Sequence, residues 1–320
     1  MGRRKTGLRV DGWVNFDKPL NMTSTEAVTR VRRLFNAQKA GHAGTLDPLA
    51  SGVLPIALGE ATKTVPFLMD ARKGYQFTVQ FGASTASCDA EGEVIAQSDA
   101  RPSEADTREI LARFLGEIDQ TPPIYSAIKV DGERAYDLSR RGEAVEMKSR
   151  RVHLYAATLV AWTPPDHATF DIFCGKGFYV RALARDLVAA LEVEGHVSAL
   201  ARTRVGPFLQ SDAIGLENLA EIVHRGPGLD GLKPVETALD DIPALAVTGE
   251  EAFQLSQGRP ILLVPRQVEA LTARLAPRNP ADQEASRCVL ATVNGRAAAL
   301  CDLRAGRLNP TRVFHLNTET

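Results

Sequence analysis

The sequence has few cysteines and no long apolar segment. Its 320 residues include four cysteines, scattered singly without a Cys-x-x-Cys pair, so neither a disulfide framework nor a structural zinc site is expected. No apolar run approaches the ~18 residues that a membrane span needs. The basic N-terminus is not followed by a hydrophobic signal region. We therefore expect a cytoplasmic protein with no membrane contact.

The sequence also lacks a strong charge of either sign. Its formal net charge is -1, whereas proteins that bind nucleic acid are often strongly basic. Basic residues nevertheless form local clusters, each of which is either a solvated face or, if the clusters converge in space, part of a surface for phosphates. These clusters are residues 3–5, 30–33, 140–141 and 148–151. Acidic residues gather at 89–93 and 236–241 and are expected to be solvated.

The length of the chain is enough for one large domain and a smaller one. The apolar fraction of 44% is ordinary for a globular protein. The sequence texture changes near Asp241, and we predict a domain boundary there, between residues 1–241 and 242–320. In the second domain the patterns predict a helix at 250–257 ended by Gly258, a strand at 261–264, a polar and mostly helical insertion at 265–287, and a hairpin of strands 288–293 and 297–301 around Asn294-Gly295.

The first domain mixes strand and helix patterns. A capping box, Thr23-x-x-Glu26, opens a helix with apolar positions up to Phe35 and arginines on its polar side. The remaining patterns predict strands at 12–19, 75–81, 152–160, 168–174 and within 196–208, helices at 103–115 and from 181 onward, and a polar, turn-rich segment at 82–92.

One stretch, residues 41–63, crowds small residues around His42 and Asp47. Its glycines and prolines predict a packed loop that presents side chains, because they disfavour a long helix or strand. Two interpretations of Asp47 are open. The carboxylate is an exposed nucleophile or base, or it hydrogen-bonds its own turn together with Thr45.

Three further features of the first domain bear on function. Tyr75 begins a strand, where a tyrosine is usually a core residue with a hydrogen-bonded hydroxyl. Arg181 lies in the first turn of a helix, where a cation opposes the helix dipole and favours an anionic partner. Residues 121–151 begin with a rigid Pro-Pro pair and become basic, which is typical of a mobile flap that orders on an anionic partner or of a solvent loop.

Taken in order, several segments resemble the bacterial tRNA pseudouridine-55 synthases, the TruB family. They cover roughly residues 10–240, and their combination is far more specific than a lone glycine-rich loop. The matching segments are residues 15–19, 41–63, 74–75, 125–129, 176–181, and 198–200 with 202–203.

The resemblance implies an α+β fold, with a central mixed, largely antiparallel sheet flanked by helices and a flap insertion at about 124–152. The tail resembles a PUA-type RNA-binding domain and implies a small β-rich C-terminal domain. The family isomerises a uridine at position 55 in the tRNA T-loop by flipping the base, breaking its glycosidic bond and rejoining it through carbon. The resemblance implies that the T-arm of tRNA is the partner and that no cofactor is needed. Assistance to tRNA folding is compatible with this activity. We expect a monomer, because no sustained apolar heptads occur.

The resemblance also implies roles for individual residues. Asp47 matches the essential aspartate, which attacks ribose C1′ or pyrimidine C6 or acts as a base; these three alternatives stay open. Tyr75 matches the tyrosine that stacks on the target base, and Arg181 the arginine that pairs with the aspartate. The implied RNA-binding residues are His42, which occupies the space vacated by the base, Leu200, which packs on the base, Tyr179, and Lys18, Lys129 and Arg202, which are phosphate or fold contacts.

Two other classes of protein were weighed. A non-catalytic RNA-binding protein uses the same fold and basic clusters, but it has no need for Asp47, Tyr75 and Arg181 together. A nucleotide-dependent enzyme needs a phosphate loop at residues 41–52, and no Gly-Lys-Ser/Thr follows there at the required spacing. The sequence therefore favours the isomerase.

Overall fold

The computed structural model describes residues 7–125, 129–130, 133–134, 141, 147–225, 231–275 and 287–316. Its larger sheet has ten strands. They are β1 (Gly12–Lys18), β2 (Ala40–His42), β3 (Ala50–Leu58), β4 (Lys73–Phe81), β7 (Gly116–Gln120), β10 (Arg150–Thr163), β11 (His167–Cys174), β12 (Gly195–Val205), β13 (Phe208–Leu209) and β14 (Leu232–Lys233).

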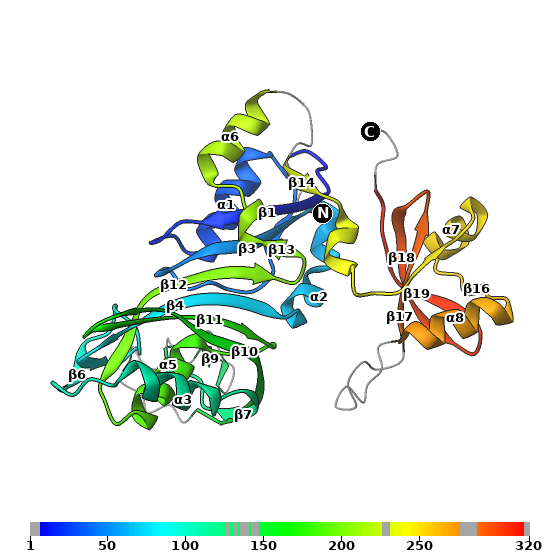
Figure 1. Ribbon diagram of the computed structural model, residues 1–320. Helices are drawn as coiled ribbons and strands as arrows, with labels where there is room; N and C mark the ends of the chain where they lie inside the picture. The colour runs from blue at the N-terminus through cyan, green and yellow to red at the C-terminus, as the bar shows by residue number, and fades with distance from the viewer. Residues whose placement is uncertain are drawn as a thin grey trace.

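The strand order across this sheet is β14-β1-β3-β12-β4-β11-β10-β7, with β2 added to β3 and β13 added to β12 (Figure 1). Strands β3 and β12 pair in parallel, and the other pairings in the described part of this sheet are antiparallel. The predicted mixed, largely antiparallel sheet is confirmed.

Helices surround the larger sheet. They are α1 (Ser24–Leu34), α2 (Val65–Asp70), α3 (Glu104–Ala112), α5 (Val180–Ala190) and α6 (Leu216–Arg225), with short 3-10 turns η1 (Gly59–Lys63), η2 (Gln210–Asp212) and η3 (Val235–Leu239). Two small two-stranded sheets pair β5 (Ala83–Thr85) with β6 (Val94–Gln97) and β8 (Lys129–Val130) with β9 (Glu133–Arg134). No helix within the described ranges has the length and apolar character needed to cross a membrane.

The period-2 pattern of β4 decides which face of the sheet is covered. Phe77 and Val79 are buried in one core cluster together with Leu183 and Leu187 of α5. Phe77 also stacks on Phe170 of β11, with ring centroids 5.1 Å apart. Because this face packs against α3 and α5 (Figure 1), the start of α5 lies beside β4 and β12.

Helix α1 begins where the sequence predicts, with only the Thr23 half of the predicted capping box, because the Glu26 carboxylate pairs with Arg30 at 2.7 Å. Thr23 caps it, its hydroxyl accepting a hydrogen bond from the Glu26 amide at 3.1 Å. The side chains of Ala27, Val31 and Phe35 are buried. Arg30, Arg32 and Arg33 are exposed, so this basic cluster is a solvated face.

The prediction that residues 41–63 form one packed loop is wrong. Only residues 43–49 are a loop, because β2 ends at His42 and β3 runs for nine residues from Ala50. The apolar side chains from Val53 onward are buried on both faces of the sheet and override the glycine and proline preferences. Gly52 has φ +95°, and a Cβ there would collide with the carbonyl oxygen of Arg202. That glycine lets β3 lie close against β12.

A second sheet of five strands forms the C-terminal part of the described chain, in the order β15-β17-β18-β19-β16. The predicted hairpin is confirmed, since Asn294 and Gly295 both have positive φ between β17 and β18. The elements are β15 (Ala244–Ala246), α7 (Gly249–Ser256), β16 (Ile261–Leu262), α8 (Pro265–Leu275), β17 (Cys288–Val293), β18 (Arg296–Arg304) and β19 (Arg307–Val313).

Some predictions fall outside the described residues. Helix α8 occupies the first part of the insertion predicted at 265–287, and residues 276–286 are not among the described residues. Most of the flap predicted at 124–152 also lies outside it, including residues 135–140 and 142–146. The division of the chain at residue 241 stays a prediction.

The two sheets share a hydrophobic core. Leu290 and Leu300 of the second sheet join a cluster with Trp13 of the first sheet and Val235 of η3. Polar contacts at η1 add to this interface, since the Lys63 ammonium donates to the Val313 carbonyl at 2.7 Å. The five-stranded sheet, with α7 and α8, therefore stands beside the larger sheet and is attached to it (Figure 1).

The close contact at Gly52 makes a testable prediction. Gly52→Ala should lower the free energy of unfolding by about 2–4 kcal/mol, because alanine is strained at this φ and its methyl meets the β12 backbone. Urea denaturation measures this loss. Gly41→Ala is the control, since a Cβ there meets nothing within 4 Å. Equal stability of the two variants would contradict the close approach of β3 and β12.

Candidate active site

A loop between β2 and β3, residues 43–49, presents Asp47. Its carboxylate is 41% exposed, and Oδ2 lies 2.8 Å from Nη2 of Arg181. The main-chain carbonyl of Asp47, rather than its carboxylate, closes the local turn by accepting from the Ala50 amide at 3.0 Å. The carboxylate is thus directed away from its own turn and toward α5.

Buried polar side chains hold the backbone of the three residues that precede Asp47. The Ser24 hydroxyl accepts from the Leu46 amide at 2.9 Å and donates to its carbonyl at 3.0 Å. Arg202 donates to the carbonyls of Gly44 at 3.1 Å and Thr45 at 3.4 Å. Since these groups come from α1 and β12, the loop is fixed between two separate parts of the fold.

Arg181 is only 6% exposed, although it carries a full charge. It pairs with two carboxylates, Asp47 at 2.8 Å and Asp89 at 3.1 Å. It also donates to the carbonyls of Ser87 at 3.2 Å and Tyr125 at 2.9 Å. Two anions and two carbonyl dipoles offset both the burial of the cation and its unfavourable position in the first turn of α5.

Asp89 corrects the expectation that residues 89–93 are a solvated acidic face. Its side chain is 8% exposed, accepts from the Ser87 hydroxyl, and accepts from the Glu91 amide at 3.1 Å. The chain turns back at Cys88, which has φ +62°. The Thr85 hydroxyl donates to the main-chain carbonyl of Asp89 at 2.6 Å, so the same turn holds both the backbone and the side chain of this residue.

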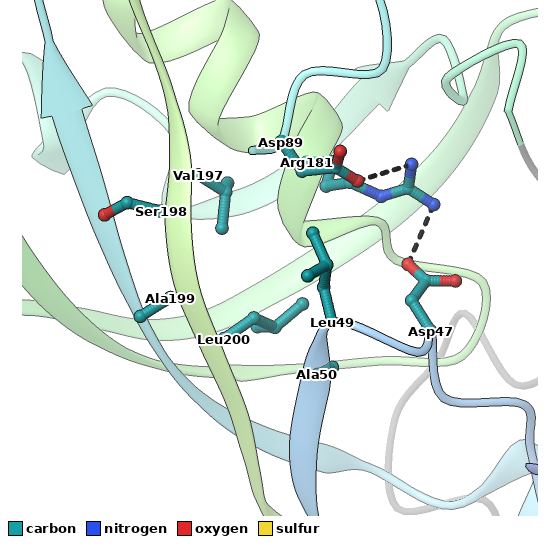
Figure 2. A pocket seen from close by; sticks show the side chains of 9 residues that line it. All are labelled: Asp47, Leu49, Ala50, Asp89, Arg181, Val197, Ser198, Ala199 and Leu200. Carbon is teal, nitrogen blue, oxygen red and sulfur yellow. Dashed lines mark ion pairs between the residues drawn. The ribbon is translucent and has the colours of Figure 1, made fainter. Parts of the chain in front are cut away.

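These side chains line one pocket. The pocket is open to solvent, and Figure 2 shows Asp47, Arg181 and Asp89 together at one end, with Leu49 and Leu200 beside them. The lining residues are Asp47, Leu49, Ala50, Asp89, Arg181, Val197, Ser198, Ala199 and Leu200. A carboxylate next to an apolar wall suits a flat, weakly polar ring with a reactive edge.

Tyr75 lies on β4, in register with Arg202 of β12. It is half-buried and packs against two core clusters. Burial raises the pKa of Tyr75 above its ordinary value. It stands close to the pocket without being one of its lining residues.

His42 ends β2 and is half-buried beside the Asp47 loop. Burial lowers the pKa of His42, and the neighbouring Arg202 charge lowers it further. Its Nδ1 atom is buried without a hydrogen-bond partner. The imidazole is therefore neutral at pH 7 and offers a flat ring rather than a charge.

Lys18 and Arg202 are fold contacts in this structure, which is one of the two roles predicted for each. Lys18 is fully buried and donates to the carbonyls of Pro19, Met22 and Pro48. Burial lowers the pKa of Lys18 to about 8, against the opposing effect of the Asp47 charge. Arg202, 1% exposed, is occupied by the loop carbonyls and by the Val53 carbonyl at 2.8 Å. Both are internal supports of the loop, because neither head group reaches solvent.

The remaining predicted RNA-binding residues are placed differently. Tyr179 directly precedes α5 and is half-buried, with the Arg150 guanidinium 4.9 Å from its ring centroid. Leu200 is half-buried in the pocket wall. Lys129 starts β8, and its side chain lies outside the described residues.

Solved structures identify the class of the fold. A chain in the crystal structure of a Cbf5-Nop10-Gar1 complex superposes with a TM-score of 0.70 and 24% identity, over 95% of this chain and 85% of that one. A chain of an H/ACA RNP bound to a substrate RNA containing 2′-deoxyuridine gives a TM-score of 0.70 at 21% identity, over 99% and 92%. The predicted fold is thus confirmed as one shared with these proteins.

Sequence comparisons then give the family. The family model "TruB family pseudouridylate synthase (N terminal domain)" matches residues 32–180, and "tRNA pseudouridylate synthase B C-terminal domain" matches 181–240. A relative from Caulobacter sp. (strain K31), named tRNA pseudouridine synthase B, is 58% identical over 99% of this chain and 100% of its own. One of the same name from Rhodospirillum rubrum is 47% identical over 99% and 100%. The chain belongs to the TruB family of pseudouridylate synthases.

The support given by Ser24 is testable. Ser24→Ala should lower the free energy of unfolding by about 1–3 kcal/mol, because the buried Leu46 amide and carbonyl both lose their partner. Thr25→Ala changes an exposed neighbour in the same helix and should cost less than about 0.5 kcal/mol. Chemical denaturation compares the two variants, and a Ser24→Ala protein as stable as Thr25→Ala would exclude this support.

Proposed function

We propose that this tRNA uridine isomerase of the TruB family acts at position 55 in the T-loop, and that Asp47 drives the reaction. The observation that supports this most directly is the half-exposed Asp47 carboxylate, held at 2.8 Å by a buried Arg181 at the mouth of an apolar pocket. A reactive group that is exposed to substrate while its orientation is fixed from behind is what an enzyme requires.

The substrate explains the shape of the pocket. A uridine within a folded loop must leave its stack before any protein group reaches its glycosidic bond. The pyrimidine ring then lies against Leu49 and Leu200, with its sugar toward Asp47. Tyr75, which packs against the same two core clusters as Leu200, is proposed to stack on the base.

Arg181 orients the attacking group. Its ion pair engages Oδ2 of Asp47, which leaves Oδ1 to face the substrate. From this position the carboxylate attacks ribose C1′, attacks C6 of the base, or removes a proton. In each case one N–C glycosidic bond breaks, one C–C bond forms, and the proton on carbon is replaced by one on nitrogen. Since the reaction is an isomerisation, it balances without a cofactor.

His42 is proposed to occupy the space that the flipped base leaves. It lies at the end of β2, directly before the loop that carries Asp47. A neutral imidazole suits this role, because burial lowers the pKa of His42 and the ring then stacks without a charge to desolvate. Stacking of this kind is worth about 1–3 kcal/mol per base. The T-arm stem-loop is the proposed element of the tRNA that is bound.

The role of Asp47 is testable with an isosteric variant. Asp47→Asn should form no detectable pseudouridine in unmodified tRNA, because a neutral amide neither attacks nor accepts a proton. Its affinity for tRNA should stay within about threefold, since the shape of the site is kept. The control, Asp99→Asn, changes an exposed acid and should keep the full rate.

Mapping the product separates the two parts of the proposal. With no cofactor added, the native protein should modify one T-loop uridine. Turnover by Asp47→Asn would remove the catalytic assignment of Asp47. Product at another uridine would instead overturn the T-loop assignment and leave the role of Asp47 in place.

A further inference from the structure

The side chain of Gln120 lies at the end of β7 and is fully buried. Its amide makes two hydrogen bonds to one backbone residue, Tyr179. Oε1 accepts from the Tyr179 amide at 2.8 Å, and Nε2 donates to the Tyr179 carbonyl at 3.1 Å. Exchanging the amide oxygen and nitrogen would break both bonds, so the hydrogen-bond pattern itself assigns the orientation of the side chain.

The backbone of Tyr179 sets where α5 begins. It is the residue from which α5 starts, with extended φ −115° and ψ 115°, and no side chain caps the helix there. Gln120 therefore supplies the pairing that a neighbouring strand would give to an extended residue. Arg181 follows two positions later, in the first turn of α5. The place where this helix begins sets the direction from which the guanidinium reaches Asp47.

The chain beyond Gln120 continues along α5. The Thr121 carbonyl accepts from Arg185 at 3.0 Å, and the Tyr125 carbonyl accepts from Nη2 of Arg181 at 2.9 Å. That same Nη2 pairs with Asp47. Buried Pro122 and Pro123 stiffen the connection between these contacts. The segment 120–125 thus contacts Tyr179, Arg181 and Arg185, and Gln120 is the one residue of the segment that uses its side chain in these contacts.

We propose that Gln120 is a positioning residue for uridine isomerisation, whose amide fixes the start of α5 and thereby the approach of Arg181 to Asp47. Gln120 is not a lining residue of the pocket, so it acts through Tyr179 and Arg181. This inference rests on the proposed roles of Asp47 and Arg181. Because a misplacement of about 1 Å costs on the order of 10²-fold in rate, a shift of the first helical turn is sufficient to slow the chemistry.

A double-mutant cycle tests this inference. Gln120→Met keeps the approximate volume of the side chain and removes both hydrogen bonds, while Arg181→Lys removes the two-pronged contact with Asp47 and Asp89. Single-turnover rates are measured with unmodified tRNA at concentrations shown to saturate each variant. Gln38→Met is the control, because Gln38 donates to the Gly7 backbone far from α5.

The expected result is a non-additive loss. Gln120→Met alone should slow the single-turnover rate by about tenfold or more, and Gln38→Met by less than about twofold. In the Arg181→Lys background, where the positioned group is already lost, Gln120→Met should cost less than about twofold. The folded fraction of each variant is measured by thermal melting, and each rate is divided by that fraction.

Three results would overturn the inference. One is the native rate in folded Gln120→Met. Another is an equal fold-loss in both backgrounds, which would place the effect of Gln120 elsewhere. The third result uses a second variant at this position, Gln120→Asn, whose shorter amide cannot reach both the amide and the carbonyl of Tyr179. Loss of the folded state in both Gln120→Met and Gln120→Asn would assign Gln120 to stability alone. A native rate in Arg181→Lys would instead remove the proposed role of Arg181, independently of Gln120.

Discussion

The buried charge of Arg181 is the constraint on which the site depends. A guanidinium that is 6% exposed at the positive end of a helix is tolerated only where several acceptors surround it. Asp47, Asp89, and the carbonyls of Ser87 and Tyr125 meet that demand. They come from separate segments of the chain, so the need to satisfy one cation brings these segments to a single point. The pocket forms where they meet.

The loop that carries Asp47 is also held by buried polar side chains. Three buried side chains form hydrogen bonds with the backbone of this loop. They are Lys18, Ser24 and Arg202. A basic residue near a proposed RNA site would ordinarily be expected to contact phosphate. Here two of the nearest basic residues face inward, and they stiffen the loop instead. The position of the Asp47 carboxylate therefore depends on charged side chains that are buried inside the protein.

Strand β3 links the site to the C-terminal sheet. Its first residue, Ala50, closes the turn after Asp47, and its last, Leu58, leads into η1. Lys63 in η1 donates to the Val313 carbonyl, and Glu60 accepts from the His315 amide at 2.8 Å. One strand in the interior of the sheet thus has the proposed catalytic loop at one end and the anchor of the second sheet at the other. The sequence pattern did not indicate this long buried strand, because Gly52 and Pro55 are typical of loops.

Periodicity and motif order in the sequence were sufficient for the α+β class, for β4, for the hairpin at Asn294-Gly295 and for the family. They were sufficient because strand alternation, turn preference and family motifs are local properties of the chain. Asp89 and Gln120 gained their roles only in the tertiary structure, as did the inward orientation of Lys18 and Arg202. Whether a polar side chain is solvated or buried depends on which distant segment covers it, and local sequence does not contain that information.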